Sequence, residues 1–170
     1  MTVPAQTQQL AAELGQLLLR KNCTITTAEC CTGGGIAYSL TAIAGSSAYL
    51  DRGFITYSNK AKQQLLAVKS ATLLQFGAVS EETVLEMAQG AAAAANAEVA
   101  VAVSGIAGPD GGSALKPVGT VCFGFYLFGH TVTTRMVFHG DRAAVRLQAI
   151  DFALQQLILL LTEQTHSTTV

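Results

Sequence analysis

Charged residues are scarce in this sequence. They make up 12% of its 170 residues, about half of the ~25% found in an average soluble domain, while 50% of the residues are hydrophobic. Because so few charges leave apolar area at the surface, we expect a homo-oligomer in which copies of the chain cover it. Tryptophan is absent, the net charge is -1, and no basic stripe interleaves with aromatic residues. Nucleic acid is therefore not an expected partner.

Targeting signals and long apolar runs are missing as well. The first residues lack the basic-then-apolar order of a signal peptide. Polar residues interrupt both of the richest apolar stretches, at Asn96 and Glu98 and at Gln155 and Gln156. Neither stretch reaches the ~20 apolar residues of a membrane span. We expect a cytoplasmic protein with no membrane partner.

Cysteine spacing excludes the common cysteine-based sites. Cys23, Cys30, Cys31 and Cys122 form no C-x-x-C pair, and the three histidines are dispersed. A disulfide between the adjacent Cys30 and Cys31 would be strained. The sequence therefore predicts free thiols, no metal site and no cofactor.

Helix and strand patterns alternate along the chain. Apolar spacing and capping residues predict helices over 5–21, from about 36 to 43, from about 59 to 66, over 70–76, over 81–95 and from 142 to about 161. Runs of β-branched and apolar residues predict strands over 24–28, 54–57 and 98–104, then a hairpin of 118–128 and 131–138. This order predicts an α/β fold, a three-layer α/β/α sandwich with a mixed β-sheet. The length suits one domain over 5–162, with 163–170 as a disordered tail.

The turn over 27–34, Thr-Ala-Glu-Cys-Cys-Thr-Gly-Gly, joins the first strand to a helix. A nucleophile there would be exposed at the sheet edge, close to backbone N–H groups able to hold an oxyanion or a phosphate. Cys30 or Cys31 could be such a nucleophile. Alternatively, both are small buried hydrophobic residues in a tight turn. The residues alone leave both interpretations open.

A lysine follows the second predicted strand. Lys60 or Lys62 could be a desolvated general base or the ionic partner of a thiolate, and Tyr57 could relay a proton. The alternative is an ordinary capped helix start with two solvated lysines.

Two further segments suit an anionic ligand. The glycine-rich turn over 104–113 follows a buried strand, where α/β proteins bind ligands, although it could be a plain loop. Arg142 and Arg146 share one face at the start of the last helix, where the helix dipole disfavours cations. They would face an anion such as a phosphate, or form a salt bridge with a nearby acid.

Six motifs in order resemble the C-terminal domain of the competence-damage protein family CinA, the nicotinamide-nucleotide amidases. The resemblance runs from about Leu10 to Leu161. Its motifs are Thr-Ala-Glu-x-Cys-Thr-Gly-Gly at 27–34, Gly-Phe-Ile-Thr-Tyr-Ser-Asn at 53–59, Gly-Ala-Val-Ser at 77–80, Ser-Gly-Ile-Ala-Gly-Pro-Asp-Gly-Gly at 104–112, Lys-Pro-Val-Gly-Thr-Val at 116–121 and Gly-Asp-Arg at 140–142.

The resemblance implies hydrolysis of nicotinamide mononucleotide to nicotinate mononucleotide and ammonia, in pyridine-nucleotide recycling and without a metal. It implies a serine nucleophile assisted by a lysine, which maps onto Lys62 with Tyr57 close by. It places the phosphate on the glycine turns and on Arg142 or Arg146. Many relatives carry a second, N-terminal domain, so this chain resembles the stand-alone type. The expected substrate-binding residues are Cys31, Thr32, Gly33, Gly34, Asn59, Gly105, Gly108, Arg142 and Arg146.

One position departs from the family pattern. Relatives read Glu-Ser-Cys-Thr-Gly-Gly, whereas this chain has Cys30 in place of the serine. A thiol is more nucleophilic than a hydroxyl, so Cys30 could form a thioester that water resolves. Sulfur is larger, however, and a displacement of ~1 Å can cost on the order of 10²-fold in rate. The alternatives are a weak or inactive member that still binds nucleotide, and a serine-to-cysteine substitution made in the laboratory.

Overall fold

The computed structural model describes residues 2–166. The helices are α1 (Ala5–Lys21), α2 (Gly35–Thr41), the short 3-10 helix η1 (Ser46–Ala48), α3 (Asn59–Leu66), α4 (Ser70–Phe76), α5 (Glu81–Ala95) and α6 (Arg142–His166). The strands are β1 (Ile25–Glu29), β2 (Phe54–Ile55), β3 (Val99–Gly105), β4 (Thr120–Leu127) and β5 (His130–Val137).

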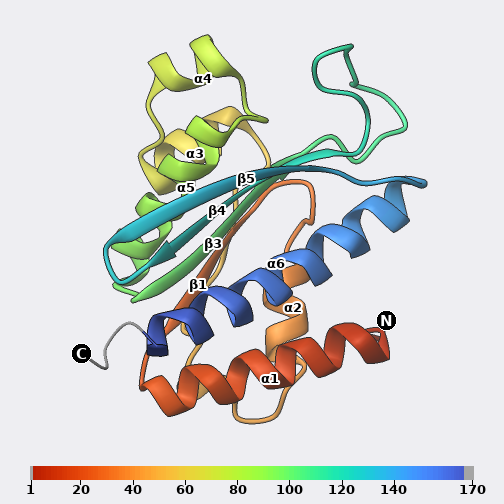
Figure 1. Cartoon of the computed structure of the whole chain (residues 1–170). Helices are drawn as coiled ribbons and strands as arrows, with labels where there is room; N and C mark the ends of the chain where they lie inside the picture. Colours follow the sequence, from red (N-terminus) through yellow and green to blue (C-terminus); the bar gives the residue numbers. More distant parts are fainter. Residues whose placement is uncertain (1, 167–170) are drawn as a thin grey trace.

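The strands form one mixed sheet in the order β2-β1-β3-β4-β5. β2, β1 and β3 are parallel, whereas β3, β4 and β5 are antiparallel neighbours. Helices α1, α2 and α6 lie on one side of the sheet, and α3, α4 and α5 lie on the other (Figure 1). The predicted three-layer α/β/α sandwich with a mixed sheet is confirmed.

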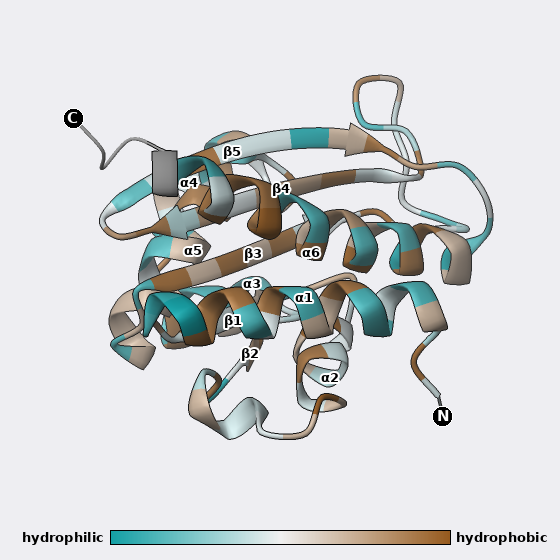
Figure 2. Ribbon diagram, turned by 60° about the horizontal axis from the view of Figure 1, so that its bottom comes forward, coloured by the Kyte–Doolittle hydropathy of each residue, from teal (hydrophilic) through white to brown (hydrophobic). Residues whose placement is uncertain are grey.

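The sequence of β3 explains why both faces of the sheet are covered. Its valines at 99, 101 and 103 belong to the core beneath α1 and α6, and its alanines at 100 and 102 belong to the core beneath α5. Successive side chains of a strand point to opposite faces. β3 therefore has no polar face, and Figure 2 shows this central strand in hydrophobic colours between the two helix layers.

The predicted helix starts and the hairpin turn follow ordinary capping and turn chemistry. Ser58, Ser80 and Asp141 each accept a hydrogen bond from the backbone N–H three residues further on, at 3.0, 3.2 and 2.9 Å. Phe128 and Gly129 connect β4 to β5 with φ angles of 49° and 95°. Positive φ at both central residues is the geometry of a two-residue hairpin turn that matches the strand twist.

Several element boundaries differ from the prediction by one or more residues, among them those of β2 and α6. β2 ends at Ile55 rather than Tyr57, because the carbonyls of Thr56 and Tyr57 accept side-chain hydrogen bonds. Helix α6 continues to His166, through residues 163–166 of the expected tail, and residues 167–170 lie outside the described residues.

Helix α6 also has the length and apolar composition of a membrane span over Arg142–Gln164. A single such helix is weak evidence, because core helices of globular proteins pass the same test. Here Val145, Ala149, Ala153 and Leu157 bury one side of it against the sheet and α1.

Candidate active site

The turn that follows β1 separates its two cysteines. The Cys30 N–H donates to the Val103 carbonyl at 3.0 Å, so the ladder with β3 continues one residue past β1. This register places Cys30 on the face of Ala28, which packs with the α3 and α5 side, and the Cys30 side chain is half-buried. Cys31 belongs to the opposite core, beneath α1, α2 and α6, and is 5% exposed. Burial first, and then the neighbouring Cys30 thiol, raises the pKa of Cys31 to about 12. Cys31 is thus the small buried residue, and Cys30 is the accessible thiol.

The Glu29 carboxylate lies at the N-terminus of α2, where an anionic ligand was predicted to bind. Its carboxylate is completely buried. It accepts hydrogen bonds from the Thr32 hydroxyl at 2.6 Å and from the Ile36 and Ala37 N–H groups at 3.0 and 2.9 Å. Those two N–H groups are therefore unavailable to a substrate. The signal in the sequence was an acidic residue at the end of an otherwise uncharged strand, directly before a helix.

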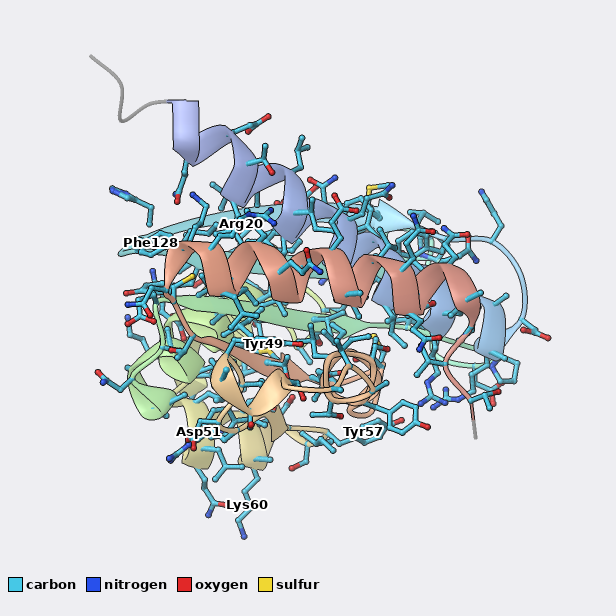
Figure 3. All side chains as sticks on the ribbon, turned by 90° about the horizontal axis from the view of Figure 1, so that it is seen from below. Arg20, Tyr49, Asp51, Tyr57, Lys60 and Phe128 are labelled. Carbon is cyan, nitrogen blue, oxygen red and sulfur yellow. The ribbon has the colours of Figure 1, made fainter. Side chains whose placement is uncertain are left out.

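The Lys62 amine and the Cys30 thiol bond to two consecutive backbone carbonyls, those of Thr56 and Tyr57. The completely buried Lys62 donates from Nζ to the Thr56 carbonyl at 2.8 Å. The Cys30 thiol donates to the Tyr57 carbonyl, with 3.7 Å between Sγ and oxygen. Lys60, by contrast, is exposed and points away from the fold (Figure 3). The interpretation of two solvated lysines is therefore wrong for Lys62.

Arg142 lies next to Tyr57 and to the glycine-rich turn over 104–113. Its guanidinium donates to the Gly108 carbonyl at 2.9 Å and to the Tyr57 hydroxyl at 3.1 Å. Tyr57 projects outward beside the start of α6 (Figure 3). The Tyr57 hydroxyl accepts a hydrogen bond from Arg142 and has none from Lys62. Tyr57 therefore contacts the Cys30 thiol through its backbone carbonyl and Arg142 through its side-chain hydroxyl.

Arg146 lies elsewhere. Its guanidinium donates to the Thr32 carbonyl at 3.1 Å, on the side of the turn that faces α2. There it lines a cavity of about 220 Å³, together with Tyr38 and Ile150. Within residues 2–166, neither Arg142 nor Arg146 forms an ion pair with an acid. The two arginines share a helix but do not converge on one anion.

Of the other expected site residues, the glycines lie in the turns that follow β1 and β3, and Asn59 lies at the surface. Gly33 and Gly34 have φ angles of 63° and 94°, which favour glycine. Gly105 ends β3, where a Cβ atom would lie 2.7 Å from the Val121 side chain. Asn59 begins α3, is exposed, and accepts a hydrogen bond from Gln63 Nε2 on its own carbonyl at 3.3 Å.

The structure thus brings together five of the expected residues, namely Cys30, Tyr57, Lys62, Gly108 and Arg142. It turns the thiol of Cys31 and the guanidinium of Arg146 to the other side of the turn. In the described part of the chain, no group of three or more His, Cys, Asp or Glu side chains could hold a metal ion.

Comparison with known proteins identifies the family. The profile of the CinA C-terminal domain matches residues 7–161. The chain belongs to this family. A nicotinamide-nucleotide amidohydrolase PncC of Enterobacter agglomerans is 60% identical over 148 residues, covering 86% of this chain and 90% of that protein. The protein of the same name in Escherichia coli K12 is 56% identical over 154 residues, covering 90% and 93%.

Solved structures agree with this assignment. The competence/damage inducible protein CihA of Agrobacterium tumefaciens superposes with a TM-score of 0.91 at 45% identity, covering 94% of this chain and 99% of that one. A CinA superfamily protein of Klebsiella pneumoniae gives a TM-score of 0.90 at 41% identity, covering 92% and 98%. The family resemblance read from the six motifs is confirmed.

Proposed function

We propose that this chain is a nicotinamide-nucleotide amidohydrolase, which converts nicotinamide mononucleotide to nicotinate mononucleotide and ammonia. Relatives that are 51–60% identical carry this activity in their names and align over most of both chains. The observation that carries the proposal is the pairing of Cys30 and Lys62 on the adjacent carbonyls of Tyr57 and Thr56. This pairing supplies a nucleophile and a base in a partly water-excluded position.

The reaction begins with proton transfer from the Cys30 thiol to the Lys62 amine. Sulfur attacks the carboxamide carbon and forms a tetrahedral adduct, and the C–N bond breaks as Lys62 returns its proton to the leaving ammonia. Water then attacks the thioester while Lys62 takes a proton from it. Nicotinate mononucleotide leaves, and the proton returns to sulfur. One water is consumed and one ammonia released, so Lys62 acts as base and acid in turn.

Arg142 is the basic side chain best placed for the phosphate of the substrate. It is exposed and lies beside Tyr57, on the accessible side of Cys30. An arginine at the rim can bind a phosphate by exchanging its bond to Tyr57 for charge-assisted bonds to the ligand. The backbone of Gly108, which the same guanidinium contacts, completes this rim.

The direct test is ammonia release from pure protein and nicotinamide mononucleotide. We expect turnover by the unaltered chain, its loss in Cys30→Ala, and trapping of an acyl-enzyme on Cys30 after acid quenching. Saturable nucleotide binding without ammonia release, in both the unaltered chain and Cys30→Ser, would instead identify a non-catalytic nucleotide-binding member. Ammonia release only after Cys30→Ser would show that the thiol disables a serine-type site.

We also propose that the protein works as a homo-oligomer in the cytoplasm. The exposed apolar side chains Tyr38 and Leu147, 44% and 37% exposed, lie beside the 220 Å³ cavity and suit a contact between copies. Sedimentation of the pure protein tests the oligomer, since a monomer at micromolar concentration would contradict it.

A further inference from the structure

Two buried hydroxyls flank Cys30 on the neighbouring strands. Ser104 follows Val103, the residue that pairs with Glu29, and Thr56 follows Ile55, which pairs with Glu29 on the other side. Both side chains are completely buried. Within the described residues, neither hydroxyl oxygen has a hydrogen-bond partner. The register therefore sets two unpaired hydroxyls in one row with Cys30.

The row faces the helix that carries Lys62. Ser104 continues the alternation of Ala100 and Ala102, whose side chains pack in the core beneath α5. Leu66 of α3 belongs to the same core, and Lys62 lies one helical turn before Leu66 on the same buried face. Lys62, Ser104 and Cys30 are thus on one side of the sheet.

Lys62 has fewer hydrogen-bond acceptors than its reaction requires. Its Nζ is bonded to the Thr56 carbonyl, the single acceptor found for it in residues 2–166. When the amine takes a proton it carries three N–H donors. A buried ammonium with unfilled donors is costly, and an unpaired buried hydroxyl is unfavourable as well. The protonated amine has N–H donors without acceptors, and the two hydroxyl oxygens are acceptors without donors.

We propose that the Ser104 and Thr56 hydroxyls are positioning groups that accept hydrogen bonds from the protonated Lys62 amine during amide hydrolysis. They are unpaired in the resting protein because their partner forms only when Lys62 has taken the proton of residue 30. This role rests on the proposed function of Lys62 as the base. It assigns a task to two residues that lie within the family motifs but outside the expected site.

The test compares Ser104→Ala and Thr56→Val with Thr27→Val. Thr27 is a matched control, because its hydroxyl is also buried and unpaired but its side chain points to the opposite face of β1. We expect kcat for nicotinamide mononucleotide to fall about tenfold or more in Ser104→Ala and Thr56→Val, with KM within twofold. The rate of Cys30 alkylation by iodoacetamide at pH 7 should fall severalfold in the same two variants.

Folding provides a second readout. Removing a hydroxyl that has no partner should leave the melting temperature unchanged or slightly raised in all three variants. An alkylation rate and a kcat within twofold of the unaltered chain in both Ser104→Ala and Thr56→Val would overturn the proposal. So would equal losses in Thr27→Val. The alkylation rate needs no turnover, so a chain that fails to deamidate the nucleotide would contradict the proposed function and still test this inference.

Discussion

The two faces of the turn at 29–34 differ in how their polar groups are paired. On the side of α2 and α6, the Glu29 carboxylate accepts three hydrogen bonds and Arg146 donates to the Thr32 carbonyl. On the side of α3 and α5, a thiol and an amine each have one backbone acceptor, and two buried hydroxyls have none. The Glu29 carboxylate fixes the turn on one face. The thiol, amine and hydroxyls of the other face keep unused hydrogen-bonding capacity, although Arg146 Nε and the Thr27 hydroxyl on the first face also lack a partner within residues 2–166.

Because of this difference, we expect substitutions on one face to lower stability and substitutions on the other face to lower activity. A carboxylate with three satisfied bonds contributes to folding, because its removal would leave buried donors without an acceptor. An under-satisfied amine or hydroxyl contributes little to folding, so its substitution should leave the stability nearly unchanged. Substitutions on the two faces should therefore fail in different assays.

The largest expected effect on activity is that of Lys62→Met. The loss of the proposed base should lower kcat by about 10²–10⁴-fold. The melting temperature should change by only a few degrees, because the lost hydrogen bond to Thr56 is offset by removal of a buried amine. Ammonia release and thermal unfolding measure the two effects. Lys60→Met is the control, since this exposed lysine should change neither; more than a tenth of the activity remaining in Lys62→Met would break the comparison.

The largest expected effect on stability is that of Glu29→Ala. Three buried donors lose their acceptor, so the free energy of unfolding should fall by about 3 kcal/mol, which corresponds to a fall in melting temperature of about 6–12 °C for a chain of this size. Glu29→Gln keeps one acceptor oxygen and should lose about half as much. Urea unfolding measures the change. Glu13→Ala on the exposed side of α1 serves as the control, and a Glu29→Ala chain as stable as this control would show that the turn is held by other contacts.

The thiols give a smaller and more selective contrast. Burial is the main cause that raises the pKa of Cys31 to about 12 and of Cys122 to about 11, and burial also raises the pKa of Cys23. Such a raised pKa leaves Cys31 protonated at pH 8, so it should not react in the folded chain. Cys30 should therefore be alkylated first by a stoichiometric reagent, and nicotinamide mononucleotide should protect it. Peptide mass spectrometry would detect the opposite result, equal labelling of all four thiols.

Much of the fold was predictable because its signals are local. Ser80 with two acids in the first turn marks the start of α5, and Gly77 marks the end of α4, and both elements have the predicted bounds. β2 was predicted too long, because the sequence of Thr56 and Tyr57 suits a strand while their carbonyls are used by distant side chains.

The candidate site was predictable as a set of motifs but not as a geometry. The expected site residues include Cys30, Cys31, Arg142 and Arg146, yet Cys31 and Arg146 face the wrong side of the turn for a shared substrate. A one-residue step along a strand reverses the face, and a four-residue step on a helix leaves the contact partner undetermined. The role of Glu29 was missed for a related reason, since its partners lie in the following helix and depend on the angle at which the chain leaves β1.

The smallest expected effect concerns a second glutamate, at the opposite ends of the same strands. Glu98 accepts hydrogen bonds from the Thr24 N–H at 2.7 Å and the Thr24 hydroxyl at 2.9 Å, and the backbone bond is the main cause that lowers its pKa. A lowered folded-state pKa stabilises the fold above the usual titration range of a glutamate, and this stabilisation is lost as the pH falls through the lowered value. Because this carboxylate is exposed and screened by solvent, Glu98→Gln should cost only about 0.5 kcal/mol at pH 7.

Thermal unfolding from pH 7 to pH 3 would measure the effect of Glu98→Gln as a small difference that vanishes at the acid end. Both carboxylates accept hydrogen bonds from backbone N–H groups and a threonine hydroxyl, but Glu29 is buried and accepts three bonds, whereas Glu98 is exposed and accepts two. If Glu98→Gln were as destabilising as Glu29→Gln, burial would not be the reason that Glu29 fixes the turn.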